Sequence, residues 1–237
     1  MTAIVFDMDD TLYDRSMPFR EAYEELFAEK YPVDFEKLYR ASKRRGDEVF
    51  EAAQKGEMPL EESHIYRFQK GFEDLGVEVT REEALCFQKR YVQRQGGIRL
   101  SPVTTKLLDE LARRGIPMGI LTNGQVEHQG RKIRKLGLEK WIPMERIVIS
   151  AACELAKPDV RIFQYAQKKL GLEGENVYFV GDSYEADILG AISAGWKTVW
   201  INKEKKEITK GLTRPDHMVY DEEELYDCIC GILEREE

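Results

Sequence analysis

The stretch Ala3–Leu12 decides the fold, and it reads Ala-Ile-Val-Phe-Asp-Met-Asp-Asp-Thr-Leu. Four apolar residues lead directly into carboxylates, and such a short, unbroken apolar run predicts a strand that is buried on both faces and ends at about Asp7. In an extended chain Asp7 and Asp9 point the same way, so their charges repel each other. A cation, a proton or a catalytic use must offset that repulsion. From this stretch alone, Asp9 and Asp10 could equally cap a helix or shape a turn.

The composition limits the classes of protein that need to be considered. The chain has 237 residues, of which 42% are hydrophobic, and this is enough for one large domain or for a core with a smaller insert. A net charge of -8 argues against a nucleic-acid-binding surface as the main function. No apolar run is long enough for a membrane span, and the chain enters its first strand without a secretory signal, so we expect a cytoplasmic protein. The four cysteines form no Cys-x-x-Cys pair, which makes zinc an unlikely ligand and reduced thiols the simple interpretation.

The segment 15–95 differs in texture from the rest of the chain. It contains no run typical of a buried strand, and its apolar residues recur at helical spacing, which predicts about four amphipathic helices. Turn residues separate these helices, and Thr80 with Glu83 forms the sequence pattern of a capping box. We therefore expect residues 15–95 to form an inserted helical-bundle domain.

Strands and helices alternate after residue 96. The sequence predicts strands over about 116–121, 147–150, 177–180, 198–201 and 217–220, with helices between them and at the end of the chain. This alternation is typical of an α/β fold, a doubly wound parallel sheet with right-handed crossovers. Residues 1–14 and 96–237 would together form this core domain.

Polar residues follow the predicted strands where a ligand is expected. Open parallel sheets bind ligands outside the carboxyl ends of their strands, where the strand order reverses. Asp7, Thr122 and Asp182 each follow a strand, and Lys157 lies in the loop region after another. The fold would therefore bring these side chains to one edge of the sheet.

Four separated motifs give the chain a family resemblance. They are Asp7-Met8-Asp9-Asp10-Thr11-Leu12, Leu121-Thr122-Asn123-Gly124, Lys157-Pro158, and Gly181-Asp182-Ser183 with Asp187. Each is weak alone, but their order and their places at strand ends are specific together. Over its whole length the chain resembles the haloacid dehalogenase superfamily, in the branch with a helical cap inserted after the first strand.

The resemblance implies phosphoryl transfer through an aspartyl-phosphate. It makes Asp7 the nucleophile and Asp9 the acid that protonates the leaving oxygen and then the base that activates water. It also implies Mg²⁺, held by the carboxylates of Asp7 and Asp182 and by the main-chain carbonyl of Asp9. These hard oxygen ligands suit a cation that neutralises charge on the transferring phosphoryl group.

The same resemblance assigns the remaining polar residues. Thr122 and the backbone N–H of Asn123 would hold phosphate oxygens, and Lys157 would act as a fixed cation beside the nucleophile. Asp187 would support the metal site from behind its direct ligands, and Ser183 would either support the site or cap the following helix. Each residue also has a plain structural alternative: a turn for Thr122 and Asn123, an exposed loop lysine for Lys157 and a helix cap for Asp182.

The second aspartate separates chemistries within the family. A halide leaves without a proton whereas an alkoxide needs one, so Asp9 favours a phosphatase over a haloacid dehalogenase. Phosphomutases often carry Gly where this chain has Asp10, which weakens that alternative. The motifs most resemble those of phosphatases acting on small metabolites of the nucleotide, phosphosugar or phosphoglycolate type. A receiver-like signalling module also has clustered carboxylates with Thr and Lys, but it needs no long helical insert.

The predicted cap offers basic residues that could recognise the rest of a substrate. They are Arg40, Lys43, Arg44, Arg45, Arg90 and Arg94. For any one of them a solvated helix face is the simpler interpretation. We expect the partner to be a small phosphorylated metabolite, with no nucleic acid and no membrane, and the sequence does not choose between a monomer and a homodimer.

Overall fold

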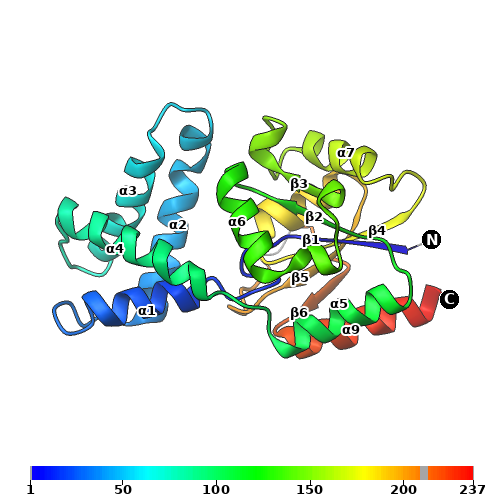
Figure 1. The fold of residues 1–237 in the computed structure, drawn as a ribbon, viewed down its shortest axis with the longest axis horizontal. Coiled ribbons are helices and arrows are strands. Elements are labelled where there is room, and N and C mark those ends of the chain that lie inside the picture. The colour runs from blue at the N-terminus through cyan, green and yellow to red at the C-terminus, as the bar shows by residue number, and fades with distance from the viewer. Residues whose placement is uncertain (1, 209–212, 237) are drawn as a thin grey trace. The chain divides into compact units, whose positions relative to one another are not determined.

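The computed structural model describes residues 2–208 and 213–236, which form two compact units. The core unit comprises the described residues of Met1–Asp14 and Arg99–Glu237, and the helical unit comprises Arg15–Ile98. Figure 1 shows the strands in the core unit and a group of helices in the other. The role of the helical unit as a cap stays a prediction.

The described part of the core unit contains a six-stranded, wholly parallel sheet with the order β3-β2-β1-β4-β5-β6. This confirms the predicted α/β class. The first strand along the chain lies inside the sheet, between β2 and β4. The strands are β1 Thr2–Phe6, β2 Met118–Thr122, β3 Ile147–Ile149, β4 Asn176–Gly181, β5 Lys197–Ile201 and β6 His217–Val219.

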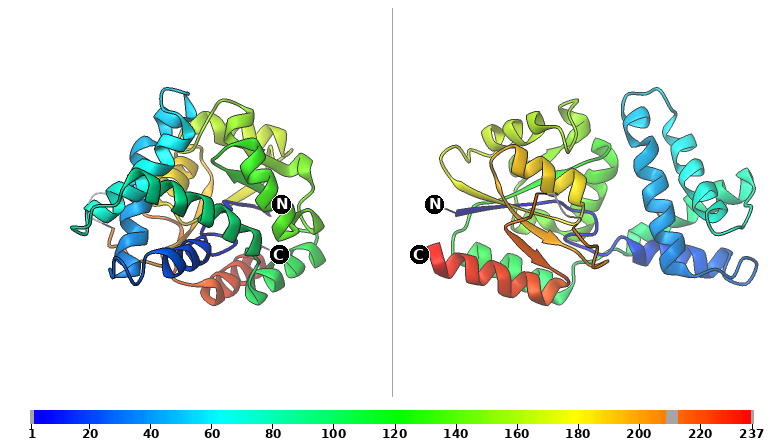
Figure 2. Two further views of the ribbon diagram at one scale, coloured as in Figure 1. Left: turned by 60° about the vertical axis from the view of Figure 1, so that its left-hand side comes forward. Right: turned by 180° about the vertical axis from the view of Figure 1, so that it is seen from behind.

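Helices cover both faces of the sheet, which explains why β1 is apolar from Ala3 to Phe6. Ala3 and Val5 pack in one hydrophobic cluster with Phe163. Side chains alternate along a strand, so Ile4 and Phe6, both fully buried, point to the opposite face. Figure 2 shows α5 and α9 side by side on one face, with α7 and α8 on the other. The core helices are α5 Pro102–Arg113, α6 Val126–Leu136, α7 Val160–Lys169, α8 Gly190–Ser193 and α9 Glu222–Glu236.

The segment after β4 differs from the single helix expected between the predicted strands over 177–180 and 198–201. It begins with a π-helical turn, Tyr184–Leu189, and continues as α8. The carbonyl of Ser183 accepts from the N–H of Asp187 and also from the N–H of Ile188, so the first turn is wider than an α-helical turn. Such turns occur often at functional sites. The wide turn places Asp187 against the end of β4, where a Cβ on Gly181 would lie 2.6 Å from Asp187 Cβ.

The helical unit is held together by an aromatic core. Phe68 and Phe87 stack with ring centroids 3.8 Å apart, and Phe19 meets Phe87 edge to face at 4.7 Å. Thr80 and Glu83 form the predicted capping box. The helices are α1 Ser16–Leu26, α2 Phe35–Gln54, α3 Leu60–Glu73 and α4 Arg81–Arg94.

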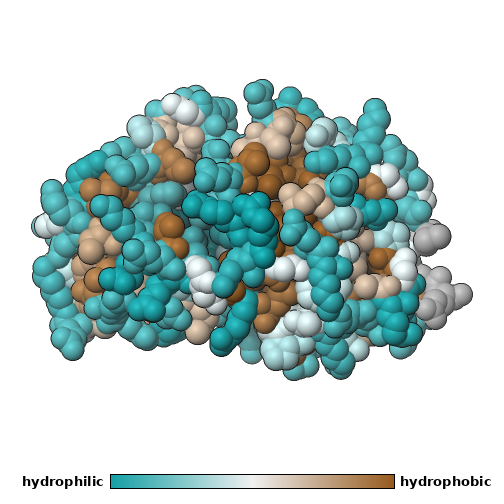
Figure 3. All heavy atoms as spheres, in the orientation of Figure 1, coloured by the Kyte–Doolittle hydropathy of each residue, from teal (hydrophilic) through white to brown (hydrophobic). Residues whose placement is uncertain are grey.

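The surface matches the high charge content of the chain. Figure 3 shows hydrophilic residues over most of the face in view, with smaller hydrophobic areas between them. None of the helices in residues 2–208 and 213–236 combines the length and apolar character that a membrane crossing needs.

Candidate active site

The carboxyl end of β1 is the natural place for a site in this sheet. After β1 the chain adds β2 and then β3 on one side of this strand. It later crosses over and adds β4 on the other side, so the strand order reverses at β1. The backbone N–H of Asp7 donates to the Val180 carbonyl of β4 at 2.8 Å. The ladder therefore continues one residue beyond β1 and fixes the backbone of Asp7 at the sheet edge.

Asp7, Lys157 and Asp187 form a buried, charged cluster at this edge. Lys157 Nζ lies 2.7 Å from Asp7 Oδ1 and 2.6 Å from Asp187 Oδ1. The Lys157 side chain is only 3% exposed, so the surface-loop alternative for this lysine is wrong. Burying charges at such depth costs free energy unless they are paired, and here one cation serves two carboxylates.

Burial and neighbouring charge act strongly on the ionisation of this cluster. Burial, reinforced by the carboxylates of Asp187, Asp182 and Asp9, raises the pKa of Asp7 to about 7 against the opposing effect of Lys157. Burial acts to lower the pKa of Lys157, but Asp187 and Asp7 outweigh it and raise that pKa. Lys157 therefore stays charged.

Three carboxylates at this edge could hold a metal ion. Asp7, Asp182 and Asp187 each offer an oxygen, and these oxygens lie within 4.8 Å of one another. Hard oxygen donors suit Mg²⁺, and a bound cation would oppose both the burial and the carboxylate repulsion that raise the pKa of Asp7. Both oxygens of Asp187 already have donors, namely Lys157 on Oδ1 and the Ser183 N–H on Oδ2 at 3.0 Å. The residues present therefore fit a magnesium site.

Ser183 and Asp182 make different hydrogen bonds in the loop after β4. The Ser183 hydroxyl accepts from the N–H of Ala186 at 3.2 Å, so Ser183 is the cap of the π-helical turn. Asp182 is not that cap, and the structural alternative considered for it is wrong. The Asp182 carbonyl accepts from Trp200 Nε1 at 3.0 Å, which ties this loop to β5.

Thr122 and Asn123 stand at the end of the neighbouring strand. Thr122 is the last residue of β2 and is 1% exposed. The Asn123 side chain binds the backbone of Lys157, accepting from its N–H and donating to its carbonyl, both at 3.0 Å. Asn123 thus links the loop after β2 to the loop that carries Lys157.

The structure brings Asp9 together with three residues that the sequence analysis did not single out. Lys132 Nζ lies 2.7 Å from Asp9 Oδ1 and 2.8 Å from Oδ2. Gln129 Nε2 donates to Oδ2 at 3.1 Å, and the Tyr13 hydroxyl donates to Oδ1. Gln129 and Lys132 are three residues apart and so share one face of α6. The sequence did offer one signal for Gln129 and Lys132, because both polar residues fall on the face of the amphipathic helix that is buried.

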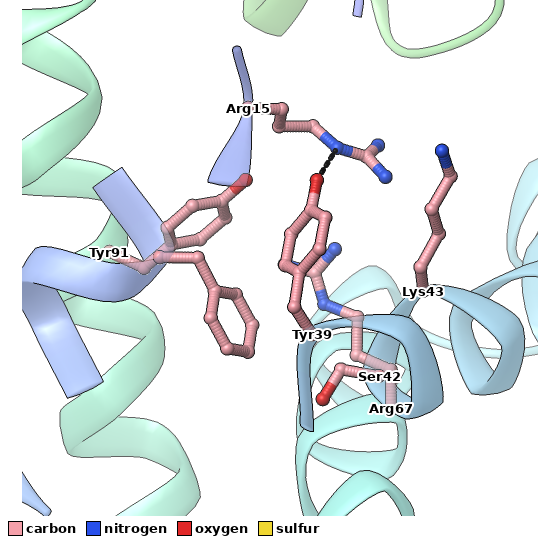
Figure 4. A pocket seen from close by; sticks show the side chains of 7 residues that line it. Arg15, Tyr39, Ser42, Lys43, Arg67 and Tyr91 are labelled. Atoms are coloured by element: carbon pink, nitrogen blue, oxygen red, sulfur yellow. Dashed lines mark hydrogen bonds between the residues drawn. The ribbon is translucent and has the colours of Figure 1, made fainter. Parts of the chain in front are cut away.

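The helical unit has a pocket of its own. It is a shallow hollow, and Arg15 Nε donates to the hydroxyl of Tyr39, another of its lining residues, at 3.3 Å (Figure 4). The lining residues are Arg15, Phe19, Tyr39, Ser42, Lys43, Arg67 and Tyr91. Of the basic residues that the sequence offered as substrate contacts, Lys43 lines this pocket.

The other basic residues of that prediction lie elsewhere. Arg44 and Arg45 pair with Asp74 at 2.7 and 2.5 Å. Arg90 and Arg94 pair with Glu25 at 3.1 and 2.5 Å. Arg40 is exposed on α2. For these arginines the solvated, charge-paired helix face is the better description.

Comparison with known proteins gives consistent results. A family model described as haloacid dehalogenase-like hydrolase matches residues 1–195. A glyceraldehyde 3-phosphate phosphatase of Methanothermobacter thermautotrophicus is 28% identical over 87% of this chain and 88% of its own length. The pyrimidine 5'-nucleotidase YjjG of Escherichia coli is 35% identical over 54% of this chain and 56% of its own. Among solved structures, the magnesium-bound HAD-hydrolase YfnB of Bacillus subtilis matches with a TM-score of 0.72 and 26% identity, over 97% of this chain and 98% of that one.

Proposed function

The chain belongs to the haloacid dehalogenase-like hydrolase family, and we propose that it is a Mg²⁺-dependent phosphomonoesterase that acts through an aspartyl-phosphate on Asp7. The single observation that carries this proposal is the buried cluster at the end of β1. Asp7 lies there with Lys157 at 2.7 Å and with Asp182 and Asp187 beside it. A carboxylate with only a structural role would not need a buried cation and two further carboxylates beside it.

Asp7 is proposed as the nucleophile. Its carboxylate attacks phosphorus in line, the bond from phosphorus to the leaving oxygen breaks, and the phosphoryl group remains on Asp7. Lys157 stays charged beside the attacking oxygen and offsets the negative charge that gathers there. The Thr122 hydroxyl and the Asn123 N–H, at the end of β2, are proposed to hold phosphate oxygens.

The side chains of Asp7 and Asp182 and the main-chain carbonyl of Asp9 would hold Mg²⁺. When bound, this ion supplies positive charge to the phosphoryl oxygens. Asp187 would keep Lys157 and the Ser183 loop in place. The magnesium-bound structure of YfnB supports this choice of metal, because it covers nearly the whole of the present chain.

Asp9 is proposed to handle the protons. It donates a proton to the leaving oxygen, and it then takes one from the water that hydrolyses the phosphoryl-Asp7 bond. This role favours a phosphatase over a dehalogenase, since a halide leaves without a proton. Relatives named as phosphatases support the same assignment.

The substrate is proposed to be a small phosphorylated metabolite. The relatives act, by their names, on a phosphorylated triose and on pyrimidine nucleotides, which share only a phosphomonoester. We further propose that the helical unit carries the substrate preference through the residues of its pocket. Arg67→Met would then change the ranking of substrates in a panel of phosphosugars, nucleotides and phosphoglycolate, whereas Arg81→Met on the surface of the same unit would not.

Turnover of p-nitrophenyl phosphate with and without Mg²⁺ tests the activity, and Asp7→Asn tests the mechanism. We expect turnover that requires Mg²⁺ and disappears in the variant. If Asp7→Asn keeps wild-type turnover, the mechanism is wrong. Halide release from a haloacid would instead indicate a dehalogenase, and a long-lived aspartyl-phosphate would indicate a signalling module.

A further inference from the structure

We infer that Lys132 and Gln129, two buried side chains of α6, position the Asp9 carboxyl and the Thr122 hydroxyl for reaction. We call these two residues the α6 clamp. They are positioning residues, because they act through Asp9 and Thr122. The inference rests on the proposed role of Asp9 as the acid and base, and the experiment below separates the two.

Lys132 holds the Asp9 carboxylate by both of its oxygens. The distances from Nζ are 2.7 Å to Oδ1 and 2.8 Å to Oδ2. The Lys132 side chain is 6% exposed and that of Asp9 is 17% exposed. A lysine this deeply buried is rare and loses hydration that only a well-placed partner offsets. The two-point contact fixes the orientation of the carboxylate as well as its place.

Gln129 connects Asp9 to the end of β2. Its Nε2 lies 2.7 Å from Thr122 Oγ1, 2.9 Å from the Asn123 carbonyl oxygen and 3.1 Å from Asp9 Oδ2. A carbonyl only accepts, and so does a carboxylate, so the amide nitrogen must face them, and its two hydrogens are shared among the three acceptors. When Gln129 donates to Thr122 Oγ1, the hydroxyl hydrogen of Thr122 is left to donate to an oxyanion. One side chain therefore orients both proposed catalytic groups.

This arrangement is unfavourable for the other end of the Gln129 amide, its oxygen Oε1. Within the described residues, Gln129 Oε1 is buried and has no hydrogen-bond partner. Leaving a buried acceptor unpaired is unfavourable, because the oxygen has lost its hydration without gaining a donor. An apolar residue of similar size would avoid that loss, so stability alone does not explain a glutamine here. The hydrogen bonds of Gln129 to the neighbouring site do explain it.

Tyr13 is a further donor to Asp9. With its hydroxyl on Oδ1, each carboxylate oxygen accepts from at least two donors. One donor has to give way when Asp9 exchanges a proton with a substrate. The clamp residues come from the rigid helix α6, whereas Tyr13 lies in the connection that follows β1.

The test compares two substrates of similar size that differ in their need for a general acid. p-Nitrophenolate leaves without a proton, whereas the alkoxide of benzyl phosphate requires one. Misplacing a reacting group by about 1 Å can cost on the order of 100-fold in rate. We therefore expect Lys132→Met to lower kcat/KM for benzyl phosphate at least about tenfold more than for p-nitrophenyl phosphate. Lys132→Arg, which keeps a cation with two donors, should restore much of the difference.

Three further variants make the outcome decisive. Asp9→Asn is the benchmark, and Lys135→Met is the control on the exposed side of α6. Gln129→Leu replaces Lys132→Met if the latter does not fold, as judged by thermal unfolding. A selective loss in Asp9→Asn with an equal loss on both substrates in the clamp variants would overturn the clamp and leave the phosphatase standing. If Asp9→Asn itself shows no selective loss, the role proposed for Asp9 is wrong.

Discussion

The two units use the same charged residues in opposite ways. In the helical unit, charges pair on the surface, as Arg94 does with Glu25, whose side chains are 42% and 33% exposed. In the core unit, Lys157 pairs with Asp7 and Asp187 at exposures of 3%, 9% and 2%. The distances are similar, at 2.5 to 2.7 Å. Depth of burial, and not pairing itself, distinguishes the two regions.

The difference shows where charge serves stability and where it serves chemistry. An exposed ion pair contributes about 0–1 kcal/mol, and the helical unit relies instead on its aromatic core. A buried pair costs hydration that apolar residues would not lose, so a buried network at a strand end suggests a use beyond stability. Matched variants test this difference between exposed and buried charges.

The largest effect is expected from the lysines. Lys157→Met removes the cation beside Asp7, and the loss of one such electrostatic group typically costs about 100- to 1,000-fold in kcat. Lys70→Met removes an exposed lysine that pairs with Glu73 in the helical unit, and it should leave kcat unchanged. Steady-state turnover of p-nitrophenyl phosphate measures both. Equal losses of kcat in the two variants would contradict the proposed difference between the buried and the exposed lysine.

The next effect concerns the metal. Mg²⁺ that binds only the folded protein at about 100 times its Kd would stabilise it by about 2.7 kcal/mol. We expect Mg²⁺ to raise Tm in the wild type and to have little effect in Asp182→Asn. The matched control is Asp109→Asn, at a half-exposed surface carboxylate that pairs with Lys140. A full Mg²⁺ shift in Asp182→Asn would show that the ion binds elsewhere.

A smaller effect follows from the ionisation of Asp7 in Mg²⁺-free protein. Its ordinary pKa is 3.8, and burial with neighbouring carboxylates raises it to about 7 in the folded chain. The folded state thus keeps a proton that the unfolded state has lost. The resulting stabilisation is complete below pH 3.8 and is lost as the pH rises through about 7. Asp7→Asn cannot ionise there, so its Tm relative to the wild type should rise from about pH 5 to about pH 8.

Thermal unfolding in a chelator at the two pH values measures this difference. Glu25→Gln in the helical unit serves as the control, because Arg94 lowers the pKa of that exposed carboxyl and its titration lies below this range. A constant difference between Asp7→Asn and the wild type would mean that Asp7 ionises normally in the folded protein.

The smallest effect is expected at Asp74, a surface carboxylate of the helical unit. Asp74 accepts from both Arg44 and Arg45. Because these groups are largely hydrated, we expect Asp74→Asn to lower the free energy of unfolding by no more than about 1 kcal/mol. Urea unfolding at two salt concentrations measures it. A loss several times larger would show that surface pairs do hold this unit together.

The sequence could predict the architecture because its signals are local. The apolar run before Asp7 predicts a buried strand, and parallel strands bring Thr122, Lys157 and Asp182 to one edge. The π-helical turn before α8 could not be predicted, because it depends on Ser183 and on the close approach of Asp187 to Gly181. Local patterns do not contain such tertiary contacts.

Partners on other elements were hidden for the same reason. Lys132 lies in a helix rich in basic residues, and only its place on the buried face with Ile133 and Leu136 separates it from the exposed Lys135. Conversely, Arg44 and Arg45 looked available to a substrate, but Asp74, which pairs with both, lies about thirty residues away on the chain. Composition and spacing find charged residues, whereas only the fold decides which of them are buried.

Acid quenching during turnover would capture the proposed aspartyl-phosphate itself. The wild type with Mg²⁺ and p-nitrophenyl phosphate would be quenched within milliseconds, digested and analysed by mass spectrometry. We expect a phosphoryl group on the peptide that contains Asp7, absent from Asp7→Asn and absent without Mg²⁺. Rapid turnover with an unmodified Asp7 peptide, or with the phosphoryl group on another residue, would contradict it.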